Sequence, residues 1–129
     1  MVVVLIIAIL IAIAVPTFLG ARTRAQDVSA KSDLRNALTT EKTSYTDNQQ
    51  YTATAATLAA IEPALKWGTA LTVTVGTAVA TDDVVCMSEA SASGTIFSLT
   101  DIADGANAGT YYSKGACANP PATTGFTGW

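Results

Sequence analysis

The chain has 129 residues, a formal net charge of −3 and no histidine. This length suits one domain with a modest core. Non-specific binding of nucleic acid needs clustered Lys and Arg, and only Lys66 and Lys114 follow Lys42, so no nucleic-acid partner is indicated. The missing histidine removes the commonest general base and metal ligand, and no catalytic, phosphate-binding or dinucleotide-binding motif is present. We therefore expect no enzymatic activity, no cofactor and no metal ion.

Residues 1–21, MVVVLIIAILIAIAVPTFLGA, contain no charged side chain. As a helix, the first 19 of them span about 28 Å, close to the hydrocarbon thickness of a bilayer. They are apolar on every face, which predicts a helix surrounded by lipid or by other apolar helices. A signal peptide fits less well, because its apolar region is usually shorter and lies between a basic stretch and a cleavage site. A plain single-span membrane anchor is an open alternative.

Pro16 interrupts the hydrogen bonding of this helix. It cannot donate to the carbonyl of Ala12, and its ring crowds that carbonyl. We therefore expect a kink or local melting between about Ala8 and Pro16. In lipid, a freed carbonyl is tolerated only where a nearby group binds it. A simple kink without a functional role is the alternative.

The helical pattern continues over residues 17–45. Apolar residues recur at three- and four-residue steps, first at Phe18, Ala21, Ala25 and Val28 and then at Leu34, Leu38 and Tyr45. Asp27 and Lys31 lie four residues apart with the acid first, the favourable order on a helix face. The two halves together predict one helix of about 45 residues, which is longer than ordinary globular helices.

The remaining residues indicate a small antiparallel sheet. Residues 46–65 are predicted to connect helix and sheet, with a short helix over 54–60. Strands are expected over 71–75, 84–88, 95–100 and 110–113, with a hairpin turn at 90–94. The long helix is expected to cross this four-stranded meander, an α+β architecture. The contact would bury Leu71, Val73 and Val75 against Val28, Leu34 and Leu38. The head thus covers 22–129: helix over 22–45, connection over 46–65, and sheet with C-terminal region over 66–129.

Cys86 and Cys117 are widely spaced and form no C-x-x-C pair. A disulfide is predicted, because a small exported domain with a limited core gains most from a covalent link. Such a bond would hold the segment with Pro120 and Pro121 against the sheet. Two buried free thiols in a cytosolic protein are the alternative. Arg22 and Arg24 directly follow the apolar segment, and by the positive-inside rule they favour a cytoplasmic head, against the disulfide.

Two further groups of side chains have a functional and a structural interpretation. Asp101 with Asp104, or Asp82 with Asp83, are candidate calcium ligands, but they lack the spacing of a recognised loop, so turn residues are predicted instead. Five aromatic residues are candidates for contact with a partner, although packing at the core or the sheet edge is favoured. These are Trp67, Tyr111, Tyr112, Phe126 and Trp129.

The run MVVVLIIAILIAIAVPTFLGARTRAQ resembles the N-terminus of type IV pilins and type II secretion pseudopilins. In that family an apolar stretch ends in an Ile/Val-Pro step, followed by small and aromatic residues and an Arg-x-x-Ala-like segment. This match covers about a fifth of the chain. The run EKTSYTDNQQYTAT, residues 41–54, looks like the end of a pilin helix. The family's basic leader, its Gly cleavage point and its Phe-Thr-Leu-Ile-Glu-Leu-like start are missing, so no residue is assigned the docking role of the family's glutamate.

The resemblance implies a pilin fold and a structural role as the major pilin of an extracellular filament. The subunit would wait in the inner membrane and then polymerise with copies of itself, with a prepilin peptidase and an inner-membrane assembly platform as partners. A basic leader would place the head outside the cytoplasm. The predicted filament-core residues are Val3, Leu5, Ile6, Ile9, Leu10, Ile13, Val15 and Phe18. The candidate inter-subunit charges are Arg22, Arg24, Asp27, Lys31 and Arg35.

Two other functions are compatible with the sequence. A major pseudopilin would form a short periplasmic filament that drives secretion, and major pseudopilins are known to bind calcium. A monomeric, membrane-anchored binding module would not self-assemble. The sequence does not distinguish adhesion, twitching, DNA uptake or secretion.

Overall fold

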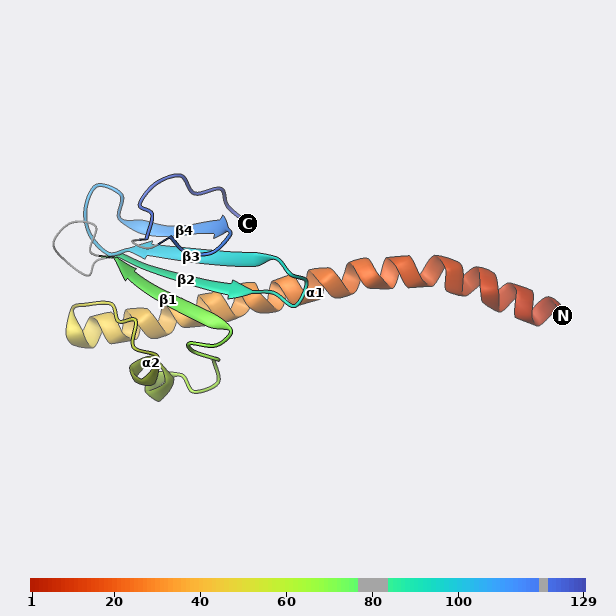
Figure 1. Cartoon of the computed structure of the whole chain (residues 1–129), viewed down its shortest axis with the longest axis horizontal. Helices are drawn as coiled ribbons and strands as arrows, with labels where there is room; N and C mark the ends of the chain where they lie inside the picture. Colours follow the sequence, from red (N-terminus) through yellow and green to blue (C-terminus); the bar gives the residue numbers. More distant parts are fainter. Residues whose placement is uncertain (77–83, 119–120) are drawn as a thin grey trace.

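The computed structural model describes residues 1–76, 84–118 and 121–129. Within these ranges the chain forms two helices and one sheet of four strands (Figure 1). The predicted α+β fold, one long N-terminal helix packed on a four-stranded antiparallel sheet, is confirmed. The elements are α1 (Val2–Asn48), α2 (Ala55–Ile61), β1 (Leu71–Gly76), β2 (Val84–Ala90), β3 (Ile96–Ile102) and β4 (Gly109–Lys114).

Helix α1 runs without a break for 47 residues and ends at Asn48, slightly beyond the predicted end near Tyr45. Gln49 then adopts a left-handed conformation, with φ of 56°, and its backbone N–H donates to the carbonyl of Tyr45. This cap satisfies one of the carbonyl groups that a helix end leaves free. The second half of α1 lies against the sheet, while the first half extends alone beyond it (Figure 1).

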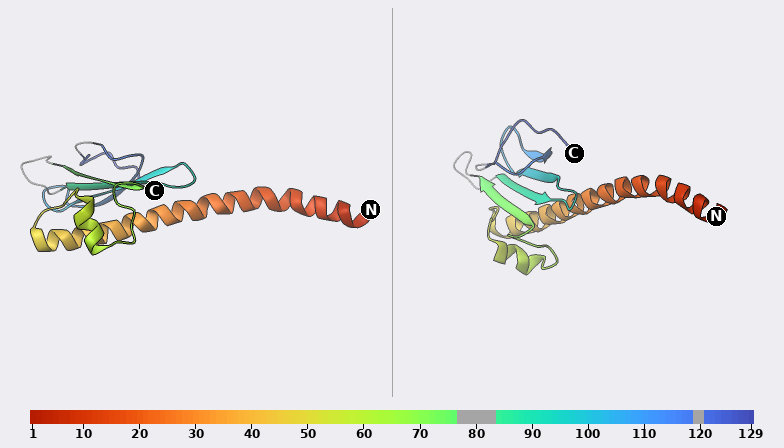
Figure 2. Two further views of the ribbon diagram at one scale, coloured as in Figure 1. Left: turned by 60° about the horizontal axis from the view of Figure 1, so that its bottom comes forward. Right: turned by 45° about the vertical axis from the view of Figure 1, so that its right-hand side comes forward.

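The helix remains continuous through Pro16. The local melting expected between Ala8 and Pro16 is therefore not seen in the isolated chain, where this half instead follows a shallow curve (Figure 2). One proline removes a single hydrogen bond, and the bonds on either side of it hold the helix. The hydroxyl of Thr17 also donates to the carbonyl of Ile13 at 3.1 Å, a side-chain contact that is common at helix bends.

The sheet is a meander in the order β1-β2-β3-β4, with each neighbouring pair antiparallel. Its register aligns apolar residues across all four strands: Val73 pairs with Met87, Met87 with Leu99, and Leu99 with Tyr112. Side chains of one face alternate with those of the other along each strand. This row therefore lies on one face, and α1 packs on that face over β2 and β3.

The predicted contact between strand and helix is largely confirmed. Leu34 and Leu71 are fully buried, and Leu38, Val73 and Val75 pack against the same core cluster. Val28 was assigned to this contact wrongly, because it is 63% exposed. At about 100° per residue it points about 200° away from Ala30, and the buried stripe of α1 is formed by Ala30, Leu34, Ala37, Thr40, Glu41 and Ser44.

The predicted disulfide between Cys86 and Cys117 is present, with the two Cα atoms 5.8 Å apart. Cys86 on β2 alternates with the core residues Val85 and Met87, so it lies on the sheet face away from α1. The bond holds the segment after β4 over this outer face. Pro121 is buried against β1, where a Cβ atom at Gly76 would lie 2.6 Å from the Cδ of Pro121. Pro120 lies outside the described residues.

The C-terminal segment then returns to the β4 edge. The indole N–H of Trp129 donates to the carbonyls of Ser98 and Ser113, and the Trp129 ring packs edge-on against Phe97 and Tyr112. Packing roles are also found for the other predicted aromatic residues. Trp67 is buried and donates to the carbonyl of Glu62, Tyr112 joins the core cluster, and Tyr111 stacks on Phe126.

Candidate functional site: the exposed stem and its junction with the head

The first 25 residues, here called the stem, are exposed along their whole length. The eight predicted filament-core residues are between 51% and 68% exposed. They are Val3, Leu5, Ile6, Ile9, Leu10, Ile13, Val15 and Phe18. Helix α1 is long and apolar enough to cross a membrane, and no part of its most apolar stretch is buried by the rest of the chain. The stem is therefore a surface that the head leaves uncovered.

Exposure of this surface to water is costly. Burying one Val, Leu or Ile side chain is worth about 1.5–3 kcal/mol, so complete burial of the dozen or so in the stem amounts to tens of kcal/mol as an upper bound. Water is the least favourable surrounding for such a helix. Because the apolar residues face all sides of α1, a contact along one side alone would leave much of the apolar surface exposed to water.

The apolar surface extends beyond the uncharged segment into the head. Phe18, Ala21, Ala25 and Val28 follow one another at three- and four-residue steps and are all exposed. A shallow groove on the stem, lined by Leu10, Ile13, Ala14, Thr17, Phe18 and Ala21, leads into this strip. Val28 thus belongs to the exposed surface of α1 and not to the core of the head.

The five candidate inter-subunit charges fall into two groups. The hydroxyl of Ser93 donates to Asp27 at 2.5 Å, and hydrogen bonds from serine hydroxyls hold the pKa of Asp27 below its usual range. The ammonium of Lys31 lies 4.6 Å from the ring centre of Phe97, and the guanidinium of Arg35 lies 5.4 Å from that of Trp129. These three side chains contact other groups of the head.

Arg22 and Arg24 form the other group. Both are exposed, and in the part of the chain that the structure describes neither has an ion-pair or cation–π contact. Inter-subunit contacts stay a prediction for all five charges, and among the described residues Arg22 and Arg24 are the two without a charged or aromatic partner in the head. The sequence did not reveal the aromatic partners of Lys31 and Arg35, because Phe97 and Trp129 reach α1 only through the folded sheet.

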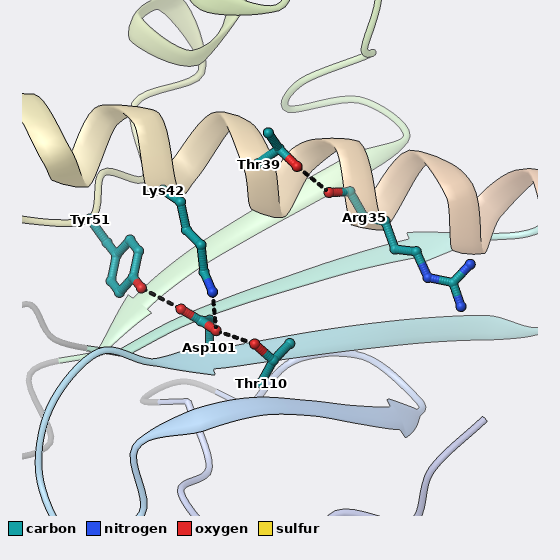
Figure 3. Close-up of polar contacts among 6 residues, drawn as sticks. All are labelled: Arg35, Thr39, Lys42, Tyr51, Asp101 and Thr110. Atoms are coloured by element: carbon teal, nitrogen blue, oxygen red, sulfur yellow. Dashed lines mark hydrogen bonds and ion pairs between the residues drawn. The ribbon is translucent and has the colours of Figure 1, made fainter.

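Asp101 is buried at the centre of a polar cluster that the sequence did not reveal (Figure 3). The hydroxyl of Tyr51 donates to one carboxylate oxygen at 2.5 Å. The other oxygen accepts from the hydroxyl of Thr110 at 2.5 Å and lies 3.2 Å from the ammonium of Lys42. Burial, and then the bond to Asp101, raise the pKa of Tyr51 above its ordinary value. The cluster joins α1, β3, β4 and the segment after α1.

Asp101 and Asp104 have different roles in the structure. Asp101 was wrongly predicted as a turn residue, because it lies within β3 and its carboxylate is occupied by protein donors. Asp104 fits the turn prediction, since its carboxylate accepts from the N–H of Gly105 at 2.6 Å. Asp82 and Asp83 lie outside the described residues.

Glu41 is a second buried acid on α1. One carboxylate oxygen accepts from the N–H of Thr52 at 3.3 Å, and burial raises the pKa of Glu41 to about 7. Its other oxygen and the hydroxyl of Ser44 are buried without a partner among the described residues. Such groups cost stability unless a proton or a water molecule satisfies them. We therefore interpret Glu41 and Ser44 as part of the packing that supports the end of α1.

No protein-family model matches the chain, and no curated protein matches its sequence. The features that bear on function are the exposed stem and the similarity of residues 1–26 and 41–54 to pilin sequences.

Proposed function

We propose that this chain is the major structural subunit of a type IV pilin-like extracellular filament and has no catalytic role. The observation that carries the proposal is the stem, which is uncharged over 1–21, exposed on every side and continuous with the helix that carries the head. An apolar helix of this kind needs a surrounding that is apolar all round. A bundle of parallel stems from many copies supplies it.

The same surface suits the membrane before assembly. Lipid and a bundle of apolar helices are similarly apolar, so transfer from one to the other gains little hydrophobic free energy. Helix packing and an inner-membrane assembly platform would supply the direction. Return of a subunit from the finished filament to water would cost tens of kcal/mol as an upper bound. We expect filaments that dissolve only in detergent.

The features shared with pilins and pseudopilins support this choice over a simple anchor. They are the apolar run that ends in a Val-Pro step, the Arg-containing continuation of the same helix, the antiparallel sheet across its second half and the disulfide near the C-terminus. An anchor needs only the first of these features. A prepilin peptidase and assembly platform are the implied partners.

The test is expression in cells that carry a type IV assembly system, followed by shearing and electron microscopy. Unaltered chain is expected in long sheared fibres, and Ile6→Lys is expected to abolish them, because the ammonium would enter the filament core. Thr72→Lys adds the same charge on the exposed side of β1 and is the matched control. Chain that stays monomeric in the membrane would contradict the proposal in favour of an anchored binding module. Short periplasmic filaments would identify a pseudopilin.

A further inference from the structure

A cleft of about 370 Å³ opens at the junction of stem and head. One wall is the start of the buried half of α1, from Gln26 to Asp33. The other walls come from the segment before β1 and from the hairpin between β2 and β3. Its charged lining consists of Asp33, Glu89 and Lys66.

One carboxylate of this cleft is incompletely satisfied by the part of the chain that the structure describes. One oxygen of Glu89 is buried without a hydrogen-bond donor among the described residues. Burial, and then the nearby charge of Asp33, raise the pKa of Glu89 to about 7, although Lys66 acts in the opposite direction. The cleft holds two carboxylates and one ammonium, so it is suited to bind an additional cation. A guanidinium offers several N–H donors in a planar group and fits paired carboxylates well.

The chain itself carries such a cation on the opposite side of α1. Arg24 precedes Asp33 by nine residues, which corresponds to about 180° around the helix and about 14 Å along it. Within one chain this arrangement keeps the two side chains apart. Complementary groups on opposite faces of one element give a head-to-tail contact, and such contacts build open polymers instead of closed dimers.

We propose that the cleft at Asp33 and Glu89 receives Arg24 of a second copy of this chain, displaced by about 14 Å along α1. The proposal rests on the filament function, because it requires parallel copies. It assigns Arg24 to one side of the subunit contact and the acidic cleft to the other. Burial of the apolar stems then holds neighbouring copies together, while this charge pair sets their axial register.

Charge reversal provides the first test. Arg24→Asp and Asp33→Arg are each expected to lower the mass of sheared filaments about tenfold, because like charges would face each other in the contact. The double variant Arg24→Asp/Asp33→Arg is expected to restore filaments. Lys114→Asp is the matched control, since Lys114 is an exposed base at the end of β4, outside the stem and the cleft lining, and should tolerate the same change. Unfolding of each variant in detergent shows whether the head remains folded.

A cysteine pair provides the second test. Arg24→Cys combined with Asp33→Cys cannot form a bond within one chain, because about 14 Å exceeds the Cα separation that a disulfide spans. Mild oxidation of filaments should instead link successive copies into a ladder, whereas each single variant should give dimers at most. Filaments that show neither rescue nor ladder would overturn this contact and leave the filament function intact. Unaltered chain that makes no filaments would overturn both.

Discussion

Tyr51 and Asp101, fifty residues apart in sequence, meet inside the head through a hydrogen bond of 2.5 Å. The bond ties the segment that follows α1 to β3, and Lys42 and Thr110 complete the polar contacts of the carboxylate (Figure 3). A buried carboxylate needs such partners, because its charge is otherwise poorly solvated. We therefore infer that this polar cluster holds the end of α1 on the sheet.

Tyr51→Phe should destabilise the head by about 1–3 kcal/mol, because it leaves one oxygen of the buried Asp101 carboxylate without its donor. Urea unfolding of the full chain in detergent, followed by tryptophan fluorescence, measures the change. Tyr111→Phe is the control with the same chemical alteration, since the hydroxyl of Tyr111 donates to the carbonyl of Asn107 at an exposed site. Equal effects of the two variants would contradict a special role for the buried bond.

Glu41 predicts how stability depends on pH. Its pKa is about 7 in the folded chain and 4.5 ordinarily, so the folded state holds the proton more tightly. The stabilisation from this proton is complete below about pH 4.5 and is lost as the pH rises through about 7. Glu41→Gln keeps the shape and cannot ionise.

The free energy of unfolding of Glu41→Gln, relative to the unaltered chain, should therefore increase by about 2–3 kcal/mol between about pH 5 and about pH 8. Urea titrations at both pH values measure this difference. Asp47→Asn, at an exposed position near the same end of α1, is the control. Its free energy of unfolding should depend on pH in the same way as that of the unaltered chain. A variant whose stability difference stays constant with pH would show that Glu41 is ionised in the folded chain.

The disulfide should contribute about 3–4 kcal/mol, because it closes a loop with a sequence separation of 31 in the unfolded chain. The double substitution Cys86→Ala/Cys117→Ala should lower the free energy of unfolding by this amount. It should also loosen the segment around Pro121 on the outer face of the sheet. Alkylation without reductant gives an independent measurement. Two reactive thiols in unreduced protein exported from the cell would contradict the bond.

Local sequence patterns predicted much of this fold. Periodicity indicated the long helix, alternation indicated β1 with its apolar face of Leu71, Val73 and Val75, and the two cysteines indicated their bond. These signals arise from neighbouring residues or from a single pair with few alternatives. The stem could be predicted from the composition and length of the apolar segment alone. It is also the part of the candidate site that the sequence predicted most completely.

The parts that the sequence did not predict depend on contacts between distant segments. The burial of Asp101 follows from the approach of Tyr51 and Lys42. The contact of Lys31 follows from the position of Trp129 beside Phe97 and Tyr112. The acidic cleft likewise exists only when Asp33 and Glu89 are brought together by the packing of α1 on β2. No residue spacing within either segment predicts these contacts.

Val28 and Leu34 provide the sharpest comparison, because both appeared to belong to one apolar stripe. Leu34 is fully buried, so Leu34→Ala should cost about 2–5 kcal/mol of head stability. Val28 is exposed on the strip that continues the stem, so Val28→Ala should change unfolding in detergent by less than about 0.5 kcal/mol. If copies bury this strip against one another, Val28→Asp should reduce filament mass, although the head remains folded. Normal filaments from Val28→Asp would show that the buried surface between copies ends before the head begins.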